Sequence, residues 1–239
     1  MISWKITYLY IFIGIFSNNA QTSEKIKVKI SPTLKKIQLF SDQKMNVVLS
    51  KGVQKKAKKL TFNCDFQSKK FFDSNLVASV TSPGLVRFNG KSFIGSMELI
   101  ARRRSGCELI NTIDLENYVS SLLTKEMNKK WPIEALKAQA IAARSYALSK
   151  KRKKKNRKFH IESSEREQVS GSYSDQNMNT DLAAFMTKGL ILSDKKGKLV
   201  EAYYHAMCGG KLLDPNHVWE GKFEGFVEKK CGHCGKYNI

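Results

Sequence analysis

The chain has 239 residues, and its 42 lysines and arginines against 21 aspartates and glutamates give a formal net charge of +21. Hydrophobic residues make up 41% of the chain and aromatic residues 10%, which is enough for a buried core and excludes a wholly disordered chain. The length suits one domain or two small ones. The charge predicts an anionic partner without distinguishing nucleic acid, membrane, wall polymer or acidic protein.

The first twenty residues have the pattern of an export signal. Lys5 lies near the start, Tyr8 to Phe16 is a short apolar run, and the small residue Ala20 could precede cleavage. The apolar run is shorter than the roughly 20 residues of a membrane-spanning helix, so we expect cleavage rather than a retained anchor. Export to the periplasm or cell envelope makes an envelope surface the expected anionic partner and permits disulfides.

Residues 21–113 have the pattern of a β-rich lobe. Ile26, Val28 and Ile30 alternate with lysines, as in a half-buried strand. Turn residues at 82–84 and 88–90 separate apolar runs, and the second turn predicts a hairpin. Further strands are expected at 47–49, 60–62, 76–80, 93–94, 97–101 and 107–113.

From Asp114 onward the pattern becomes helical. Asp114 is a candidate cap for a helix that starts at Leu115, and Pro132 suits the first position of a second helix over 133–150. A third helix is expected over 181–190, then a hairpin over 190–204 and an irregular tail with three of the five cysteines. We therefore predict an α+β protein in which a signal at 1–20 precedes one domain over 21–239, with lobes at 21–113 and 114–239.

One carboxylate continues the apolar stripe of the first expected helix. Leu115, Tyr118, Leu122 and Glu126 share a face at a spacing of three to four residues. A half-desolvated carboxylate has a raised pKa, which a general acid needs near neutral pH. Alternatively the helix ends at Thr124 and Glu126 is a solvated surface residue.

Two basic residues of the second helix, Lys137 and Arg144, are seven residues apart and therefore lie near one face. An exposed basic edge explains them equally well. If they flank Glu126, they lower its pKa and are better interpreted as groups that position a sugar.

Several segments of the chain together resemble one known family. The longest is the run from Trp131 to Ala147, and the others lie at 87–90, 95–98, 118–119, 125–127, 168–169, 189–190, 202–205, 208–210 and 218–219. These segments are similar to the stage II sporulation protein D / LytB (SpoIID) family. The resemblance implies a lytic transglycosylase that cleaves peptidoglycan glycan strands, or an enhancer of a cell-wall amidase.

The resemblance also implies roles for individual residues. Glu126 matches the catalytic acid/base, and the expected substrate-binding residues are Lys137, Arg144, Gln168, Tyr204 and His205. A single carboxylate suffices for a lytic transglycosylase, because the 6-hydroxyl of the sugar replaces the water or second carboxylate of a hydrolase. The chain departs from the family pattern at Ser170 to Ser172, where a tyrosine and a glycine pair are common, and at Cys208, where a serine is common.

The C-terminal cysteines suggest a structural zinc site. Cys231 and Cys234 form a Cys-x-x-Cys element, Cys208 adds a third thiolate, and His205 or His217 could supply the fourth ligand. A disulfide between two of these three cysteines, or a redox pair, is the alternative.

The two remaining cysteines, Cys64 and Cys107, either form a disulfide or are two buried thiols.

A basic run follows the second helix. Eight of its nine residues are basic, namely Lys150, Lys151, Arg152, Lys153, Lys154, Lys155, Arg157 and Lys158. We expect a solvated loop that holds the protein to anionic envelope phosphates. Because the run contains no aromatic residue for base stacking, a nucleic-acid partner is not expected. The expected partners are peptidoglycan strands, an anionic envelope surface and a cell-wall amidase.

Overall fold

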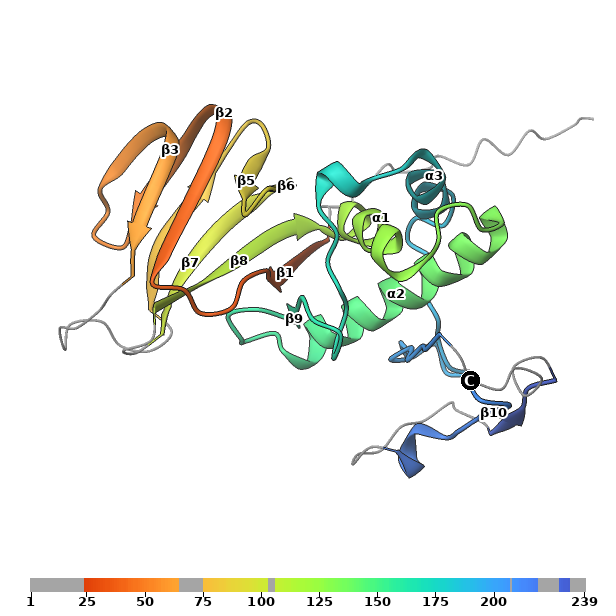
Figure 1. Ribbon diagram of the computed structural model, residues 1–239. Coiled ribbons are helices and arrows are strands. Elements are labelled where there is room, and N and C mark those ends of the chain that lie inside the picture. Colours follow the sequence, from red (N-terminus) through yellow and green to blue (C-terminus); the bar gives the residue numbers. More distant parts are fainter. Residues whose placement is uncertain (1–23, 65–74, 103–105, 207, 219–227, 233–239) are drawn as a thin grey trace, which may run out of the picture.

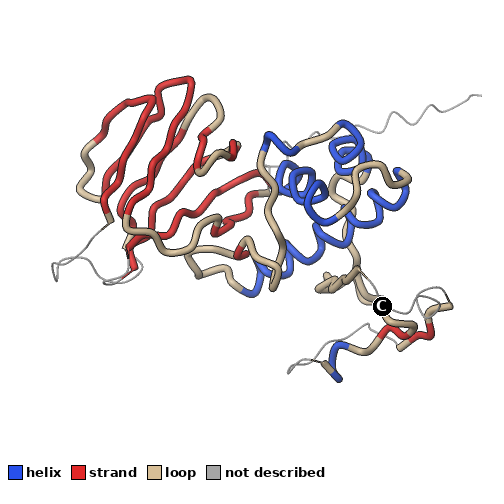
Figure 2. Tube along the Cα trace, viewed as in Figure 1, coloured by secondary structure: helices blue, strands red, loops and turns tan. Residues whose placement is uncertain are grey.

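The computed structural model describes residues 24–64, 75–102, 106–206, 208–218 and 228–232. It shows an α+β protein in which a large sheet precedes a group of helices (Figures 1 and 2). The predicted fold class is therefore confirmed. The predicted signal at 1–20 and Cys234 lie outside the described residues.

Nine strands form the main sheet in the order β6-β5-β2-β4-β7-β8-β1-β9, and β3 pairs with β2 outside this path. The pairing of β1 with β9 is parallel, and the other pairings are antiparallel. The strands are β1 Lys25–Lys29, β2 Lys36–Leu49, β3 Gln54–Asn63, β4 Leu76–Thr81, β5 Val86–Phe88, β6 Lys91–Phe93, β7 Ser96–Arg102, β8 Gly106–Asp114 and β9 Ile161–Glu162.

The strands form where apolar and polar residues alternate. In β2, Ile37, Leu39, Met45 and Val47 are buried while their neighbours in the sequence are largely exposed. These side chains join a core with residues of β3, β4, β7 and β8. The strand positions predicted from the sequence are confirmed, although β2 begins at Lys36, well before the predicted start.

The predicted hairpin at residues 88–90 is present between β5 and β6. Asn89 and Gly90 have φ angles of 47° and 75°, which a tight two-residue hairpin turn requires. Asparagine and glycine tolerate this left-handed backbone at low cost, so the local sequence determines the turn.

Three helices pack beside the β8 and β1 end of the sheet (Figure 1). They are α1 Leu115–Glu126, α2 Ile133–Lys153 and α3 Met178–Met186. Asp114 caps α1 as predicted, because its side chain accepts hydrogen bonds from the backbone of Glu116 (2.9 Å) and Asn117 (3.2 Å). Pro132 is the cap residue of α2 rather than its first helical residue.

A second core lies between the helices and β1. It contains Ile26 and Val28 of β1, the buried leucines of α1 and the small residues of α2 and α3. Buried alanines at 140, 143 and 147 let α2 approach its neighbours closely.

Three predictions for the second half of the chain are wrong in part. The third helix, expected over 181–190, is α3 Met178–Met186, so it begins and ends earlier than predicted. Helix α2 continues through Lys153, so the first four residues of the basic run are helical and not part of a loop. The predicted hairpin over 190–204 is reduced to one bridge between Ser193 and Leu199. In the tail, β10 Lys211–Leu212 pairs with β11 Lys229–Lys230.

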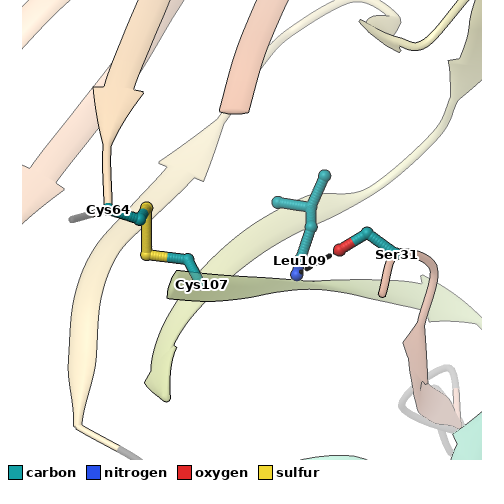
Figure 3. The surroundings of a disulfide bond; sticks show 4 residues. All are labelled: Ser31, Cys64, Cys107 and Leu109. Carbon is teal, nitrogen blue, oxygen red and sulfur yellow. Dashed lines mark hydrogen bonds between the residues drawn. A yellow bond between two sulfur atoms is a disulfide. The ribbon is translucent and has the colours of Figure 1, made fainter. Parts of the chain in front are cut away.

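A disulfide joins Cys64 after β3 to Cys107 in β8 (Figure 3). Both cysteines are fully buried, and their Cα atoms lie 5.6 Å apart. Nearby, the backbone N–H of Leu109 donates to the Ser31 hydroxyl at 2.9 Å. The predicted pairing is confirmed, and the alternative of two free thiols is wrong.

No helix in the described part of the chain has the length and apolar character needed to span a bilayer.

Candidate active site

Glu126 is the last residue of α1 and is half-buried. The helix reaches it, so the alternative in which α1 ends at Thr124 is wrong. Leu115, Tyr118 and Leu122, which share its stripe, are buried as predicted. Burial raises the pKa of Glu126, and a hydrogen bond from the backbone of Val169 partly opposes that rise.

The loop at 168–171 supplies this hydrogen bond. The N–H of Val169 donates to Glu126 Oε1 at 3.1 Å. Two residues later, a Cβ atom on Gly171 would lie 1.9 Å from the carbonyl oxygen of Ser121 in α1. Only glycine permits so close an approach, so Gly171 seats the loop against α1 and places Val169 beside the carboxylate. From the sequence alone, Gly171 could be identified only as part of a segment that departs from the family pattern.

Gln168 connects two tyrosines in the interior. Its side chain accepts from the Tyr118 hydroxyl at 3.0 Å and donates to the Tyr204 hydroxyl at 3.0 Å and to the Ala143 carbonyl at 3.3 Å. Burial raises the pKa of Tyr204, and the charge of Glu126 raises it further, so this phenol stays neutral near the carboxylate. The structure therefore brings Glu126, Gln168 and Tyr204 together. Tyr118, which the sequence placed only in the core, completes the group.

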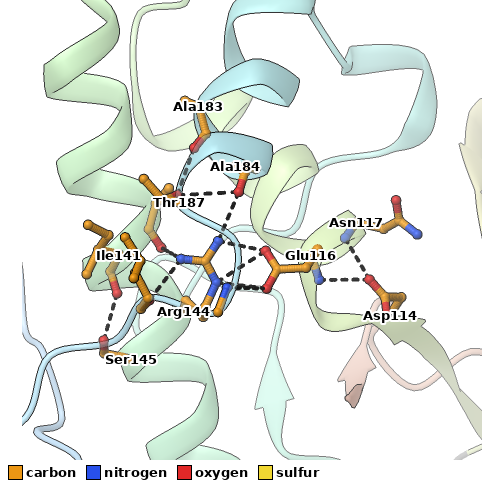
Figure 4. A network of polar contacts seen from close by, with 12 residues as sticks. Asp114, Glu116, Asn117, Ile141, Arg144, Ser145, Ala183, Ala184 and Thr187 are labelled. Carbon is orange, nitrogen blue, oxygen red and sulfur yellow. Dashed lines mark hydrogen bonds and ion pairs between the residues drawn. The ribbon is translucent and has the colours of Figure 1, made fainter. Parts of the chain in front are cut away.

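Arg144 lies outside this group. Its side chain is 1% exposed and forms an ion pair with Glu116 of α1 at 2.6 Å (Figure 4). It also donates to the carbonyl oxygens of Leu190 (3.0 Å) and Ala184 (3.3 Å). The prediction that Arg144 contacts substrate does not fit this position, because its guanidinium is enclosed and fully engaged. We interpret Arg144 as the residue that ties α2 to α1 and α3.

Lys137 also has a partner on its own helix. Its ammonium group pairs with Glu134 at 2.9 Å, one turn earlier in α2. The side chain remains 24% exposed, so a role in substrate binding stays a prediction.

A hollow of about 120 Å³ lies beside the loop that holds Glu126. It is lined by Ile30, Phe88, Asn89, Lys91, Phe93, Ser163 and Ser170. Ser170 follows Val169 in the sequence, and its N–H donates to the Ser163 hydroxyl at 3.0 Å. Pockets that enclose small ligands usually measure about 300–1,000 Å³, so this hollow is too small to enclose one.

The segment that carries Glu126 and its contacts matches a known family. Residues 103–193 match the model of the SpoIID family, described as stage II sporulation protein. This segment is similar to that family. The resemblance inferred from the sequence is confirmed, and the matched residues include Glu126, Gln168 and Gly171.

Two relatives share part of this chain. An uncharacterised protein of Brachyspira hyodysenteriae is 35% identical over 132 residues, which is 55% of this chain and 35% of the relative. A Bacillus subtilis protein named amidase enhancer is 34% identical over 112 residues, which is 47% of this chain and 15% of the relative. The chain thus covers about a third and about a seventh of these two proteins.

The remaining predicted site residues follow the matched SpoIID segment. His205 is exposed, directly after Tyr204. Pairing of β10 with β11 brings the segments of Cys208 and Cys231 together, and the N–H of Cys231 donates to the Gly210 carbonyl at 2.8 Å. His217 pairs with Glu228 at 3.0 Å.

The zinc site stays a prediction. Cys234, one of its expected ligands, lies outside the described residues. Within the described ranges, no group of three or more His, Cys, Asp or Glu residues is arranged to hold a metal ion.

Proposed function

We propose that this protein is a peptidoglycan lytic transglycosylase with Glu126 as its acid and base. The observation that carries the proposal is the half-buried Glu126 at the end of α1, whose pKa burial raises. Burial raises the pKa of Glu126, the direction a general acid requires, and the N–H of Val169 opposes part of that rise. The family match supports a role at the cell wall.

In the proposed reaction, the protonated Glu126 donates its proton to the glycosidic oxygen as the bond to the anomeric carbon breaks. The resulting carboxylate accepts the proton of the sugar 6-hydroxyl while that oxygen attacks the anomeric carbon. A 1,6-anhydro ring closes, and Glu126 is protonated again. The N–H of Val169 stabilises the intermediate carboxylate and keeps it in place.

Tyr204 and Gln168 are the proposed neighbours of the substrate. The neutral Tyr204 hydroxyl can donate a hydrogen bond to a sugar oxygen, and Gln168 holds it in position. His205 and Lys137 are partly or fully exposed and extend the proposed contacts to the surface.

The test compares wild type with Glu126→Gln on glycan strands, both intact and stripped of stem peptides. We expect 1,6-anhydro ends by mass spectrometry from wild type, and a loss of about 10²-fold or more in the variant. Glu134→Gln is the matched control, because Glu134 is 75% exposed on α2, and it should keep full activity. No anhydro product from wild type on either substrate would contradict the proposal.

A second candidate is a non-catalytic activator of a cell-wall amidase. The name of the Bacillus subtilis relative, amidase enhancer, favours it. The discriminating assay measures amidase activity on whole walls with and without the protein. If Glu126→Gln enhances amidase activity as well as wild type does, and wild type makes no anhydro ends, the protein acts as a non-catalytic activator.

Both candidates act at the cell envelope. Export through the segment at 1–20 therefore belongs to the same proposal.

A further inference from the structure

The least neutralised positive surface of the described chain is the β2–β3 hairpin. Six lysines lie between residues 44 and 59, and the sequence has no acidic residue between Asp42 and Asp65. The lysines are Lys44, Lys51, Lys55, Lys56, Lys58 and Lys59. All six are exposed, and none forms an ion pair within the described ranges.

The basic run at 150–158 differs from this hairpin. Lys150 lies 3.3 Å from Glu201, Lys154 lies 2.6 Å from Glu167, and Lys151 pairs with Glu24 at 2.6 Å. Lys153 also pairs with Glu201. Four of the eight basic residues of this run thus form ion pairs with carboxylates. The positive electrostatic potential of the run is therefore weaker than its number of basic residues suggests.

The hairpin has the shape of a linear docking surface. β3 is at the edge of the sheet, paired only with β2, and four of the six lysines follow one another along this extended strand. Successive side chains of a strand point to opposite faces of the sheet, so Lys55 and Lys56 lie on different faces and the row runs along the open edge of β3, at about 3.3 Å per residue, rather than forming a compact pocket. Among the described residues beside the row, the exposed ring of Phe40 has the ammonium group of Lys59 at 5.4 Å from its centre, so this face of the ring already has a cationic partner.

The hairpin also lies away from the candidate active site. Figure 1 shows β2 and β3 at the end of the sheet opposite the helices that carry Glu126. A polymer bound to the hairpin therefore leaves Glu126 accessible.

We propose that the β2–β3 hairpin is a docking surface for an extended, phosphate-bearing polymer of the cell envelope, bound through its row of lysines. Compact ammonium groups bind phosphate oxygens as point charges, and each contact releases counterions from the polymer. Lysines on an edge strand also prevent sheet-to-sheet aggregation, and the experiment separates the two roles.

The experiment measures binding of fluorescently labelled poly(glycerol phosphate) to the full chain by anisotropy at several salt concentrations. The test variant replaces Lys55, Lys56, Lys58 and Lys59 with Gln. The matched control replaces Arg152, Lys155, Arg157 and Lys158 with Gln, so that both variants lose four charges. We expect the hairpin variant to bind at least about tenfold more weakly at low salt, and its log–log salt slope to fall by about 3. The control should change by less than threefold.

A third variant, with the four hairpin lysines changed to Arg, keeps the charge and should bind like wild type. Circular dichroism confirms that each variant is folded. Equal losses in the hairpin and control variants would overturn the proposal, because only net charge would then matter. Tighter binding of wild type to phosphatidylglycerol vesicles or to single-stranded DNA than to the polymer would also overturn it. So would a hairpin variant that self-associates but binds the polymer normally.

Discussion

Two carboxylates of α1 have opposite environments. Glu116 in the first turn meets the buried guanidinium of Arg144, whereas Glu126 in the last turn meets one backbone N–H and no cation that alters its pKa. The first is suited to holding helices together, and the second to exchanging a proton.

The pH dependence of the proposed activity follows from Glu126. Because burial raises its pKa, activity should fall as pH rises through that pKa and the acid loses its proton. The rate of anhydro-end formation between pH 4 and pH 9 measures this. A rate that rises steadily over the same range would contradict a protonated Glu126.

Folding stability should show the same linkage. Glu126 binds its proton more tightly in the folded state than in the unfolded state. Its contribution to folding stability is therefore fully present below pH 4.5 and is lost as pH rises through the raised pKa. Glu126→Gln, which keeps an acceptor for Val169, should therefore melt at a higher temperature than wild type at pH 7 and at the same temperature at pH 4. Calorimetry at the two pH values checks it.

Arg144 is expected to be a structural residue. In Arg144→Met, the carboxylate of Glu116 and two carbonyl oxygens lose their partner, so the free energy of unfolding should drop by about 3–5 kcal/mol. Lys137→Met on the same helix should change it by less than about 1 kcal/mol. Urea denaturation gives both values. If Arg144→Met is as stable as wild type and loses only activity, the residue contacts substrate after all.

At the scale of elements, His160 fastens the second half of the chain to the sheet. Its backbone N–H donates to the carbonyl of Lys27 at 2.9 Å, and its Nδ1 accepts from the N–H of Lys27 at 3.1 Å. This places β9 beside β1 at one edge of the main sheet. Burial lowers the pKa of His160 to about 4, and the nearby charges of Lys151, Lys27 and Lys154 add to the effect.

Acid should therefore weaken this junction. The folded state keeps His160 neutral. The contribution of His160 to folding stability is therefore complete above pH 6.5 and is lost as pH falls toward 4. The loss is on the order of 2–3 kcal/mol. His160→Asn keeps an acceptor for Lys27 but does not titrate, so the difference in unfolding free energy between pH 7 and pH 4 should shrink by that amount. An unchanged difference would contradict the assignment.

The paired strands β10 and β11 join two segments of the C-terminal tail. They bring Cys208 and Cys231 into neighbouring segments, as a shared metal site requires. We predict one zinc per chain by elemental analysis, lost on changing Cys208 to Ser. Since Cys64 and Cys107 are joined, thiol titration of the native protein reports the C-terminal cysteines alone. Absence of zinc together with oxidised C-terminal thiols would establish a disulfide instead.

At the scale of the whole molecule, the disulfide closes a long loop through the sheet. Cys64 and Cys107 are 43 residues apart, and the bond joins the end of β3 to β8 across four intervening strands of the sequence. Such a bond suits a protein that folds in an oxidising compartment.

Removing the disulfide should destabilise the protein strongly. Loop-closure entropy for a loop of this size corresponds to about 4 kcal/mol, so Cys64→Ala/Cys107→Ala should lower the unfolding free energy by about that amount. The measurement is urea denaturation under non-reducing conditions. A reductant should lower the unfolding free energy of wild type to that of the double variant. It should cause no change in the unfolding free energy of the double variant that is attributable to this bond.

Local patterns were sufficient for most elements. Alternation of apolar residues placed the strands, and Asp114 and the Asn89–Gly90 turn marked boundaries that the structure confirms. The stripe that ends at Glu126 likewise placed the candidate acid, because it depends on spacing within one helix.

Long-range contacts decided the rest. Arg144 is buried because Glu116, Ala184 and Leu190 meet it from segments up to 46 residues away. The basic run continues a helix, and four of its eight basic residues are paired because Glu24, Glu167 and Glu201 converge on it. The exposed hairpin lysines form no ion pair within the described residues.

The amino-acid pattern thus determined where most strands lie, where α1 begins and which carboxylate terminates an apolar stripe, since these follow from residues a few positions apart. Tertiary structure alone decided which of the many charges are neutralised and which remain available, because a charge is neutralised only by the groups that folding brings within a few ångströms.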